Sequence, residues 1–219
     1  MQKISPFFPS RRFPPVEESD ENGLLAMGGE LSIETLLDAY THGIFPWPTG
    51  EHQLMLWWSP DPRGILELEQ AHFSRRLLRT CRGGKFTVTF DADFPQVIRQ
   101  CAVAHGSTWI TRKMIQGYIR LHNAGYAHSV EVWHDDQLVG GVYGVAIRGL
   151  FAAESMFHTM TDASKVALFY LINRLRERGF RLLDIQMVTP HTQRFGAIEI
   201  PRTEYLTRLD EALTHHCVF

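Results

Sequence analysis

Polar side chains interrupt two otherwise apolar stretches of the chain, and they are the first candidates for chemistry. Glu154 lies within residues 151–157, and Asp184 and Gln186 lie within residues 182–187. A carboxylate in an apolar strand is costly to bury unless it is paired or used. Because side chains alternate along a strand, we expect Asp184 and Gln186 on one face, where they could share a ligand. Spacing alone leaves a catalytic face and a merely solvated face equally open.

Tryptophans gather in a proline-broken stretch of the N-terminal part. Trp47, Trp57 and Trp58 lie there, and Trp109 follows later in the chain. Aromatic side chains usually fill a core, but their position between prolines favours at least one exposed platform for a ring. Nucleic-acid bases stack on such platforms, each with about 1 to 3 kcal/mol.

A basic run follows this aromatic stretch. Five cations and no acid occur within residues 75–85, namely Arg75, Arg76, Arg79, Arg82 and Lys85. A solvated helix face is the usual meaning of such a run. Together with the tryptophans, it supports contact with a phosphate backbone.

Composition and missing motifs narrow the class of protein. The 219 residues include 44% hydrophobic and 21% charged side chains and carry a net charge of −2, so a site for a polyanion must be local. The three cysteines and scattered histidines form no metal-ligand pattern, and we expect a cytoplasmic protein without a membrane span or metal. Phosphate-loop, dinucleotide and nucleophile-elbow motifs are missing, which argues against nucleotide hydrolysis and triad chemistry.

The elements that must position these side chains are of mixed type. Residues 1–23 read as an extended lead-in, and residues 44–63 contain too many prolines for regular structure. Capping residues and apolar spacing predict helices in the first half at 33–42 (after Ser32), 73–81, 95–105 and 112–123 (after Thr111), with a strand at 86–90.

The second half predicts a sheet with crossing helices. Strands are expected at 129–133, 138–147, 150–157, 181–187 and 197–200, and helices at 163–178, after Thr189 and at 205–213. Asp162 is the expected cap of the long helix, and glycines in the second strand, including Gly144, indicate a bulge or a close backbone approach. The resulting order is ββ(β)αβαβ.

Five strings are together distinctive: GLLAMGGELS at 23–32, GIFPW at 43–47, WWSPDPR at 57–63, ESMF at 154–157 and DASK at 162–165. On these motifs the chain resembles the bacterial leucyl/phenylalanyl-tRNA protein transferase family, from about Phe13 to the C-terminal helix. The resemblance implies an α+β fold, with a small N-terminal lobe at 1–70 and a GNAT-like (acyl-CoA N-acyltransferase-like) catalytic domain at 71–219.

The resemblance also implies an activity. Family members move Leu, Phe or Met from aminoacyl-tRNA to proteins whose first residue is Arg or Lys, which marks those proteins for degradation by the N-degron pathway. They use no cofactor, and we expect a monomer.

Site residues are implied by the same resemblance. Asp184 and Gln186 match the catalytic pair, Glu154 matches an active-site glutamate, and the run from Arg75 to Lys85 falls where the family contacts the tRNA body. The matching substrate-binding residues are Trp47 and Trp109 for the terminal adenosine, Phe151 and Met156 as pocket walls, and Leu171 and Leu175 on the pocket helix, where an aromatic side chain is familiar. Ala153 and His158 also depart from the family pattern.

Such a reaction needs few catalytic groups, because an aminoacyl ester is already activated. An α-amino group has a pKa of about 7.7 to 8.0, so a useful fraction of it is neutral at pH 7. Asp184, oriented by Gln186, is expected to accept or steer the proton of the amine, so a general base and an anchor for a cationic amine both remain open. An acetyl-CoA-dependent N-acyltransferase is disfavoured, because residues 158–162 contain no glycine. A non-catalytic RNA-binding module would leave Glu154, Asp184 and Gln186 unexplained.

Overall fold

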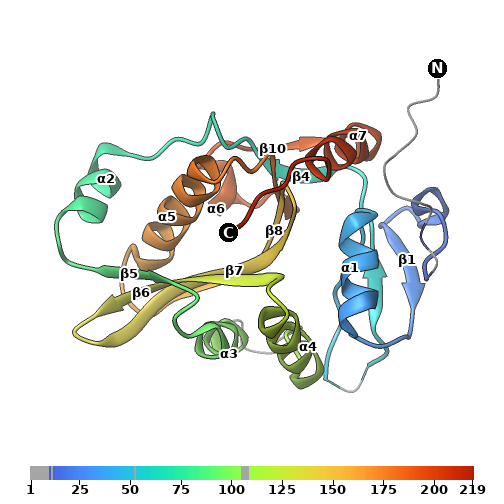
Figure 1. The fold of residues 1–219 in the computed structure, drawn as a ribbon, viewed down its shortest axis with the longest axis horizontal. Coiled ribbons are helices and arrows are strands. Elements are labelled where there is room, and N and C mark those ends of the chain that lie inside the picture. The colour runs from blue at the N-terminus through green and yellow to red at the C-terminus, as the bar shows by residue number, and fades with distance from the viewer. Residues whose placement is uncertain (1–9, 11, 52, 105–108) are drawn as a thin grey trace.

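The computed structural model describes residues 10, 12–51, 53–104 and 109–219, and it consists of two sheets with helices packed around them (Figure 1). A three-stranded sheet has the order β1-β3-β2, and a seven-stranded sheet has the order β10-β4-β9-β8-β7-β6-β5. The α+β class expected from the sequence is confirmed.

The small sheet is built from the N-terminal part of the chain. Its antiparallel strands are β1 (Leu24–Met27), β2 (Phe45–Pro46) and β3 (Leu56–Trp58), with α1 (Ile33–Thr41) beside them and η1 (Val16–Glu18) before them. The expectation that residues 44–63 lack regular structure is therefore wrong. Pro46 is compatible with pairing because β2 is an edge strand, where a missing N–H donor can face away from the ladder.

The large sheet confirms the order read from the second half of the sequence. Its strands are β4 (Arg63–Leu66), β5 (Thr87–Phe90), β6 (Ala127–His134), β7 (Gln137–Ile147), β8 (Leu150–His158), β9 (Leu182–Gln186) and β10 (Ala197–Ile200). Neighbours are antiparallel except β8 and β9, which are parallel because α5 (Ala163–Glu177) connects them as a crossover.

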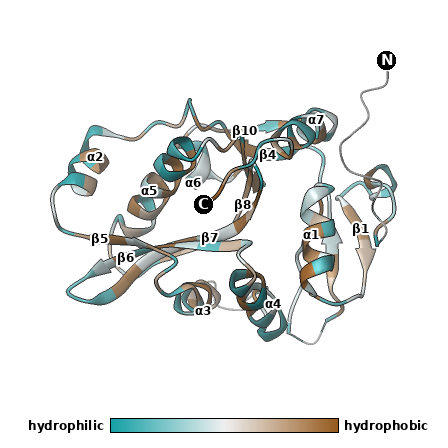
Figure 2. Ribbon diagram, viewed as in Figure 1, coloured by the Kyte–Doolittle hydropathy of each residue, from teal (hydrophilic) through white to brown (hydrophobic). Residues whose placement is uncertain are grey.

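Helices cover both faces of the large sheet. α2 (Arg75–Arg82) and α5 lie over one face, and α3 (Phe94–Ala104) and α4 (Arg112–Asn123) lie over the other (Figure 1). α6 (Pro190–Gln193) and α7 (Arg202–Ala212) follow near β10 and β4. Hydrophobic residues concentrate where these layers meet (Figure 2), in two buried clusters.

Several helices begin at the capping residues that the sequence indicates. The side chains of Ser32, Thr111 and Thr189 accept hydrogen bonds from helix N–H groups, as predicted. Asp162 stands at the predicted N-cap position of α5, but it has a left-handed φ of 71° and its side chain makes no capping hydrogen bond. Its carboxylate instead accepts from Lys165 (2.8 Å), which lowers its pKa.

The large sheet takes one strand from the N-terminal part of the chain. β4 pairs with β9 on one side and with β10 on the other, and its four residues are buried. A strand with two neighbours must satisfy its main chain within the sheet, which ties β4 to the large domain. The boundary between the N-terminal lobe and the catalytic domain, placed between residues 70 and 71, stays a prediction. β4 lies on the N-terminal side of that boundary.

Two irregularities in the large sheet matter for the site. Tyr143 pairs with Ser155 and Gly144 with Ala153, so Glu154 is the extra residue of a bulge on β8. Gly64 pairs with Gln186 and Ile65 with Asp184, so Ile185 is the extra residue on β9. Bulges redirect side chains that alternation would otherwise place.

Glycines make both bulges possible. A Cβ at Gly144 would overlap the carbonyl oxygen of Ala152, and one at Gly64 would lie 2.7 Å from the carbonyl carbon of Met187. The close backbone approach predicted for the glycines of β7 is confirmed at Gly144.

Candidate functional site

A mainly apolar cavity of about 520 Å³ lies beside β8 where β8 and β9 diverge. The two strands pair only from Leu150 to Ala152, and the following residues of β8, from Ala153 to His158, line the cavity. β2, Trp109, the end of β9 and α6 supply further walls. Of the residues predicted for the site, the lining includes Trp47, Trp109, Glu154, Met156 and Gln186.

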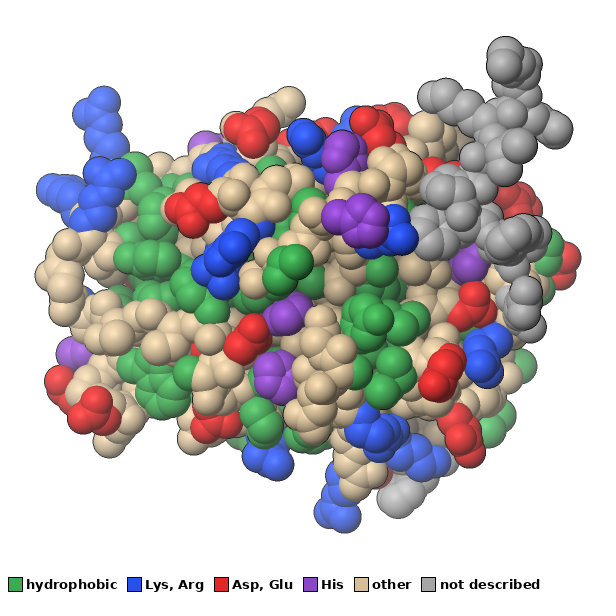
Figure 3. Space-filling view, viewed as in Figure 1, with side chains coloured by type: hydrophobic (Ala, Val, Ile, Leu, Met, Phe, Trp, Pro, Cys, Tyr) green, Lys and Arg blue, Asp and Glu red, His purple; other side chains and the backbone are tan. Residues whose placement is uncertain are grey.

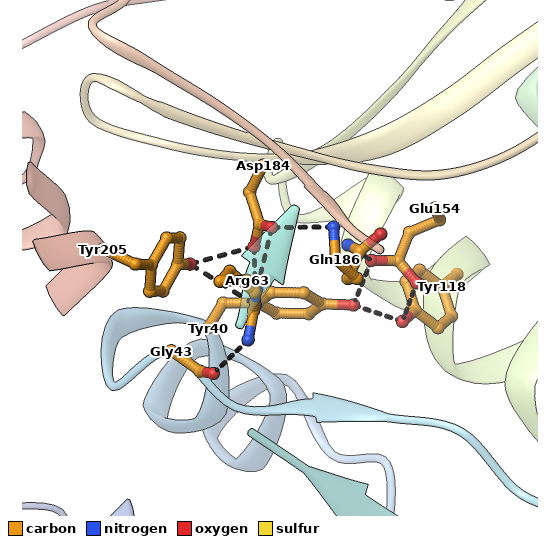
Figure 4. Close-up of polar contacts among 8 residues, drawn as sticks. All are labelled: Tyr40, Gly43, Arg63, Tyr118, Glu154, Asp184, Gln186 and Tyr205. Atoms are coloured by element: carbon orange, nitrogen blue, oxygen red, sulfur yellow. Dashed lines mark hydrogen bonds and ion pairs between the residues drawn. The ribbon is translucent and has the colours of Figure 1, made fainter. Parts of the chain in front are cut away.

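Glu154 is the carboxylate of this lining. It accepts hydrogen bonds from the hydroxyls of Tyr40 (2.7 Å) and Tyr118 (2.9 Å), and from the Gln186 amide (3.4 Å; Figure 4). Burial raises the pKa of Glu154 to about 7, although the hydrogen bonds from both tyrosines lower it. The site therefore holds a carboxyl group that changes charge near neutral pH.

Both tyrosines act as neutral donors. Burial raises the pKa of Tyr40 and of Tyr118 well above the usual range, and the nearby Glu154 adds to the effect. Tyr40 comes from α1 and Tyr118 from α4, and their hydroxyl oxygens also lie in close contact with each other. Glu154 thus accepts hydrogen bonds from three separate parts of the chain: α1, α4 and, through Gln186, β9.

Asp184 does not face the cavity. Its carboxylate accepts from Arg63 Nε (2.9 Å) and Nη2 (2.6 Å), from the Tyr205 hydroxyl (2.9 Å), and from the main-chain N–H of Gln186 (2.9 Å; Figure 4). Only 1% of the residue is exposed. The expectation that Asp184 and Gln186 present one face to a shared ligand is wrong, because the bulge at Ile185 breaks the alternation.

Gln186 ends β9 and brings its amide to the cavity. It has a left-handed φ of 60°, a conformation that costs energy in residues other than glycine and often occurs at functional sites. The hydrogen bond from its N–H to Asp184 fixes the main chain in this position. Its side chain lies next to Glu154 (Figure 4).

Two half-buried tryptophans form the aromatic wall. The ring centroids of Trp47 and Trp109 lie 6.4 Å apart at 78°, and those of Trp47 and Trp58 lie 6.1 Å apart. Trp58 donates its indole N–H to the Trp47 carbonyl (2.9 Å), which holds that segment. Trp57 instead belongs to the core, with 2% exposed.

Three predicted substrate-binding residues do not reach the cavity. Phe151, Leu171 and Leu175 are buried in the core between the large sheet and α5, and the Phe151 ring stacks on Phe219 at 5.5 Å. The apolar lining comes instead from other residues, such as Val142 on β7 and Ile185, the bulge residue of β9.

The basic run lies outside the lining of the cavity. Arg75, Arg76, Arg79, Arg82 and Lys85 are exposed on α2 and just after it, and none lines the cavity. Lys and Arg side chains project over α2 at the upper left of Figure 3. Arg76 approaches Asp162 at the start of α5 (3.3 Å).

Several residues at the site were not predicted. Arg63 and Tyr205 bind Asp184, and Tyr40 and Tyr118 bind Glu154. Arg63 did leave a signal, since it is a cation at the start of the apolar run Gly64-Ile65-Leu66 and so requires a buried partner. The tyrosines gave no such signal, because a tyrosine on the buried face of a helix cannot be told from an ordinary core residue by sequence.

Within the described ranges, no three His, Cys, Asp or Glu side chains converge in a way that could hold a metal ion. In the same part of the chain, every helix is too short or too polar to cross a membrane.

An apolar cavity that carries an amide and a carboxylate beside an aromatic wall suits an organic substrate with both apolar and polar groups. The family model described as leucyl/phenylalanyl-tRNA protein transferase matches residues 65–210, and the model of its N-terminal domain matches residues 29–61. The chain belongs to this family. It is therefore a tRNA-dependent aminoacyltransferase that acts on proteins.

Relatives named leucyl/phenylalanyl-tRNA–protein transferase are similar over most of the chain. One from Solidesulfovibrio magneticus is 53% identical, with 91% of this chain and 82% of the relative covered. Another, from Stutzerimonas stutzeri, is 52% identical, with 93% and 90% covered.

Solved structures are similar at much lower identity. The C-terminal domain of a putative lysylphosphatidylglycerol synthetase from Agrobacterium fabrum has a TM-score of 0.43 at 11% identity, covering 72% of this chain and 52% of that one. A GCN5-related N-acetyltransferase from Kribbella flavida has a TM-score of 0.40 at 11% identity, covering 76% and 59%.

Proposed function

We propose that the enzyme transfers Leu, Phe or Met from aminoacyl-tRNA to the N-terminal Arg or Lys of acceptor proteins, and so marks them for degradation by the N-degron pathway. The observation that carries this proposal is the cavity: its walls are mostly apolar, and its lining carries a carboxylate, Glu154, beside the amide of Gln186. Apolar walls suit the donor side chain, and a carboxylate suits a cationic acceptor.

The donor occupies the aromatic and apolar part of the cavity. The rings of Trp47 and Trp109 hold the terminal adenosine by stacking. Met156, Val142 and Ile185 receive the amino-acid side chain, whose burial is favourable by roughly 0.8 kcal/mol per CH₂ group. Charged donor side chains are rejected, because this wall offers them no partner.

The reaction is aminolysis of an ester. The neutral α-amine of the acceptor attacks the ester carbonyl, the new C–N bond forms, and the C–O bond to the ribose breaks. The amine proton ends on the ribose oxygen that leaves. Gln186 positions the amine and stabilises the tetrahedral intermediate through its amide. Asp184 holds the main chain of Gln186 in this scheme and does not bind the amine, since its oxygens already accept hydrogen bonds from Arg63, Tyr205 and the Gln186 main chain.

Glu154 selects the acceptor. In its charged form it attracts the positive group of an N-terminal Arg or Lys at the end of the cavity nearest Gln186. Tyr40 and Tyr118 keep its carboxylate turned to one side, which fixes where that positive group binds.

A direct assay tests the proposal. The enzyme is incubated with radiolabelled leucyl-tRNA, or separately with labelled acetyl-CoA, and with peptides that begin with Arg or with Asp. We expect label from leucyl-tRNA on the Arg peptide and none on the Asp peptide. Label from acetyl-CoA, or equal labelling of both peptides, would contradict the proposed substrates.

A further inference from the structure

Arg63 is a fully buried cation that contacts two segments next to the cavity, the end of β9 and the residues before β2. Its exposure is 0%, and its guanidinium lies over the rings of Tyr205 (4.4 Å) and Phe45 (4.9 Å). Its nitrogen atoms point in two directions, to Asp184 on β9 and to the carbonyl of Gly43 (Figure 4).

The first direction leads to the aromatic wall. Arg63 Nη1 donates to the Gly43 carbonyl (2.8 Å), and the chain then runs through Phe45 and Pro46 to Trp47, three residues that line the cavity. Gly43 is itself confined, because a Cβ there would lie 3.0 Å from the ring of Tyr205. The start of the wall is therefore held against Arg63 and α7.

The second direction leads to Gln186. Oδ1 of Asp184 accepts from Arg63 Nε and also from the main-chain N–H of Gln186, both at 2.9 Å. One oxygen atom thus separates the guanidinium from the residue that carries the amide. Because the fork of arginine is planar and rigid, the relative orientation of its two partners is set by its geometry.

We propose that Arg63 is a positioning residue that aligns the Trp47 wall with Gln186, so that the bound donor ester lies at the amide. The inference rests on the proposed function, in which Trp47 holds the donor and Gln186 acts at the reaction centre. Lysine at this position would keep the charge but could not reach Asp184 and Gly43 in the same geometry.

Three variants separate this role from general stabilisation. Asp184→Asn keeps the shape of the side chain, and it should lower the single-turnover rate about tenfold while the donor KM stays within twofold. Arg63→Lys should lower the rate similarly and also raise the KM for leucyl-tRNA about fivefold. Arg176→Lys is the matched control, since Arg176 donates to the carbonyls of Leu68 and Ala71 away from the cavity, and it should change neither value beyond twofold.

All rates are divided by the concentration of folded enzyme, so that a loss of folded protein is not counted as a loss of activity. A donor KM within twofold of wild type for Arg63→Lys would overturn the proposal, and so would an equal rise in KM for Asp184→Asn. If Arg63→Lys does not fold, the paired variant Arg63→Met/Asp184→Leu leaves no charge buried alone. It should raise the donor KM about fivefold, and an unchanged donor KM would again overturn the proposal. An inactive wild type would contradict the proposed function instead.

Discussion

Gln186 is the side chain on which the proposed chemistry depends most directly. Its amide lines the cavity, and its main chain is held in a left-handed conformation by Asp184. Glu154 lies beside it as a carboxyl group with a pKa of about 7. In the proposed mechanism, Gln186 positions the reacting groups, and Glu154 supplies a charge that depends on pH.

Removing the amide tests this assignment. Gln186→Ala should lower the single-turnover rate of leucyl transfer about 10²-fold, because an interaction made in the transition state is lost, while the donor KM stays within twofold. The control is Gln193→Ala, an exposed glutamine on α6. A Gln186→Ala rate within twofold of wild type would exclude a role in the reaction.

The pH dependence of stability tests Glu154. Its pKa in the folded protein, about 7, is raised above the usual 4.5, mainly by burial. Its contribution to stability is therefore complete below about pH 4.5 and is lost as the pH rises through 7. The lost part amounts to about 3 kcal/mol.

We expect Glu154→Gln to remove that part of the pH dependence. Urea unfolding at pH 5 and pH 8 should show a smaller difference for the variant than for the wild type. Equal differences in the two proteins would mean that Glu154 ionises at its ordinary pKa. The same variant should raise the acceptor KM for Arg-initiated peptides at pH 8, where the wild-type carboxylate is charged.

At the scale of elements, the two bulges shape the cavity. They leave Glu154 on β8 and Ile185 on β9 without a partner in the ladder, and both residues line the cavity. Periodicity identified these strands but could not reveal the bulges, because an alternating pattern assumes an unbroken ladder. The strands β1, β2, β3 and β4 were missed for a related reason: they are short segments, most of them next to prolines, and their pairing is decided by distant partners.

Gly144→Ala tests the bulge on β8. A methyl group there would overlap the Ala152 carbonyl and the Phe151 ring, so we expect the free energy of unfolding to fall by about 1 to 3 kcal/mol. Gly50→Ala is the control, because its added methyl group would meet only Gln53, at 3.8 Å. Urea titration measures both, and similar stability of the two variants would contradict the close approach.

At the scale of the whole molecule, the cavity and the basic run occupy different places. The cavity lies beside β8 and β2, whereas the five cations lie on and after α2, which packs on α5. A tRNA is long enough to reach both. We infer that the basic run contacts the tRNA body while the cavity holds only its aminoacylated end.

Salt dependence tests this division. Replacing Arg75, Arg76 and Arg79 together by Gln should weaken binding of leucyl-tRNA and reduce the slope of log K against log salt, by about 0.7 to 0.9 for each lost phosphate contact. Transfer from a minimal aminoacyl-adenosine should change little. Arg178→Gln with Arg181→Gln is the control, since both side chains are exposed beyond the other end of α5. Unchanged affinity and slope in the triple variant would remove α2 from the tRNA interface.

The sequence by itself determined the α+β class, the order of elements in the second half, and the polar residues Glu154, Asp184 and Gln186. Those features depend on local periodicity, caps and the cost of a charge in an apolar strand. Only the tertiary structure decided that Asp184 is turned away from the cavity, that Arg63 and three tyrosines hold the carboxylates, and that Phe151, Leu171 and Leu175 belong to the core. These outcomes depend on contacts between residues far apart in the chain, such as Arg63 and Asp184, whose meeting is set by strand pairing and bulges that no local pattern records.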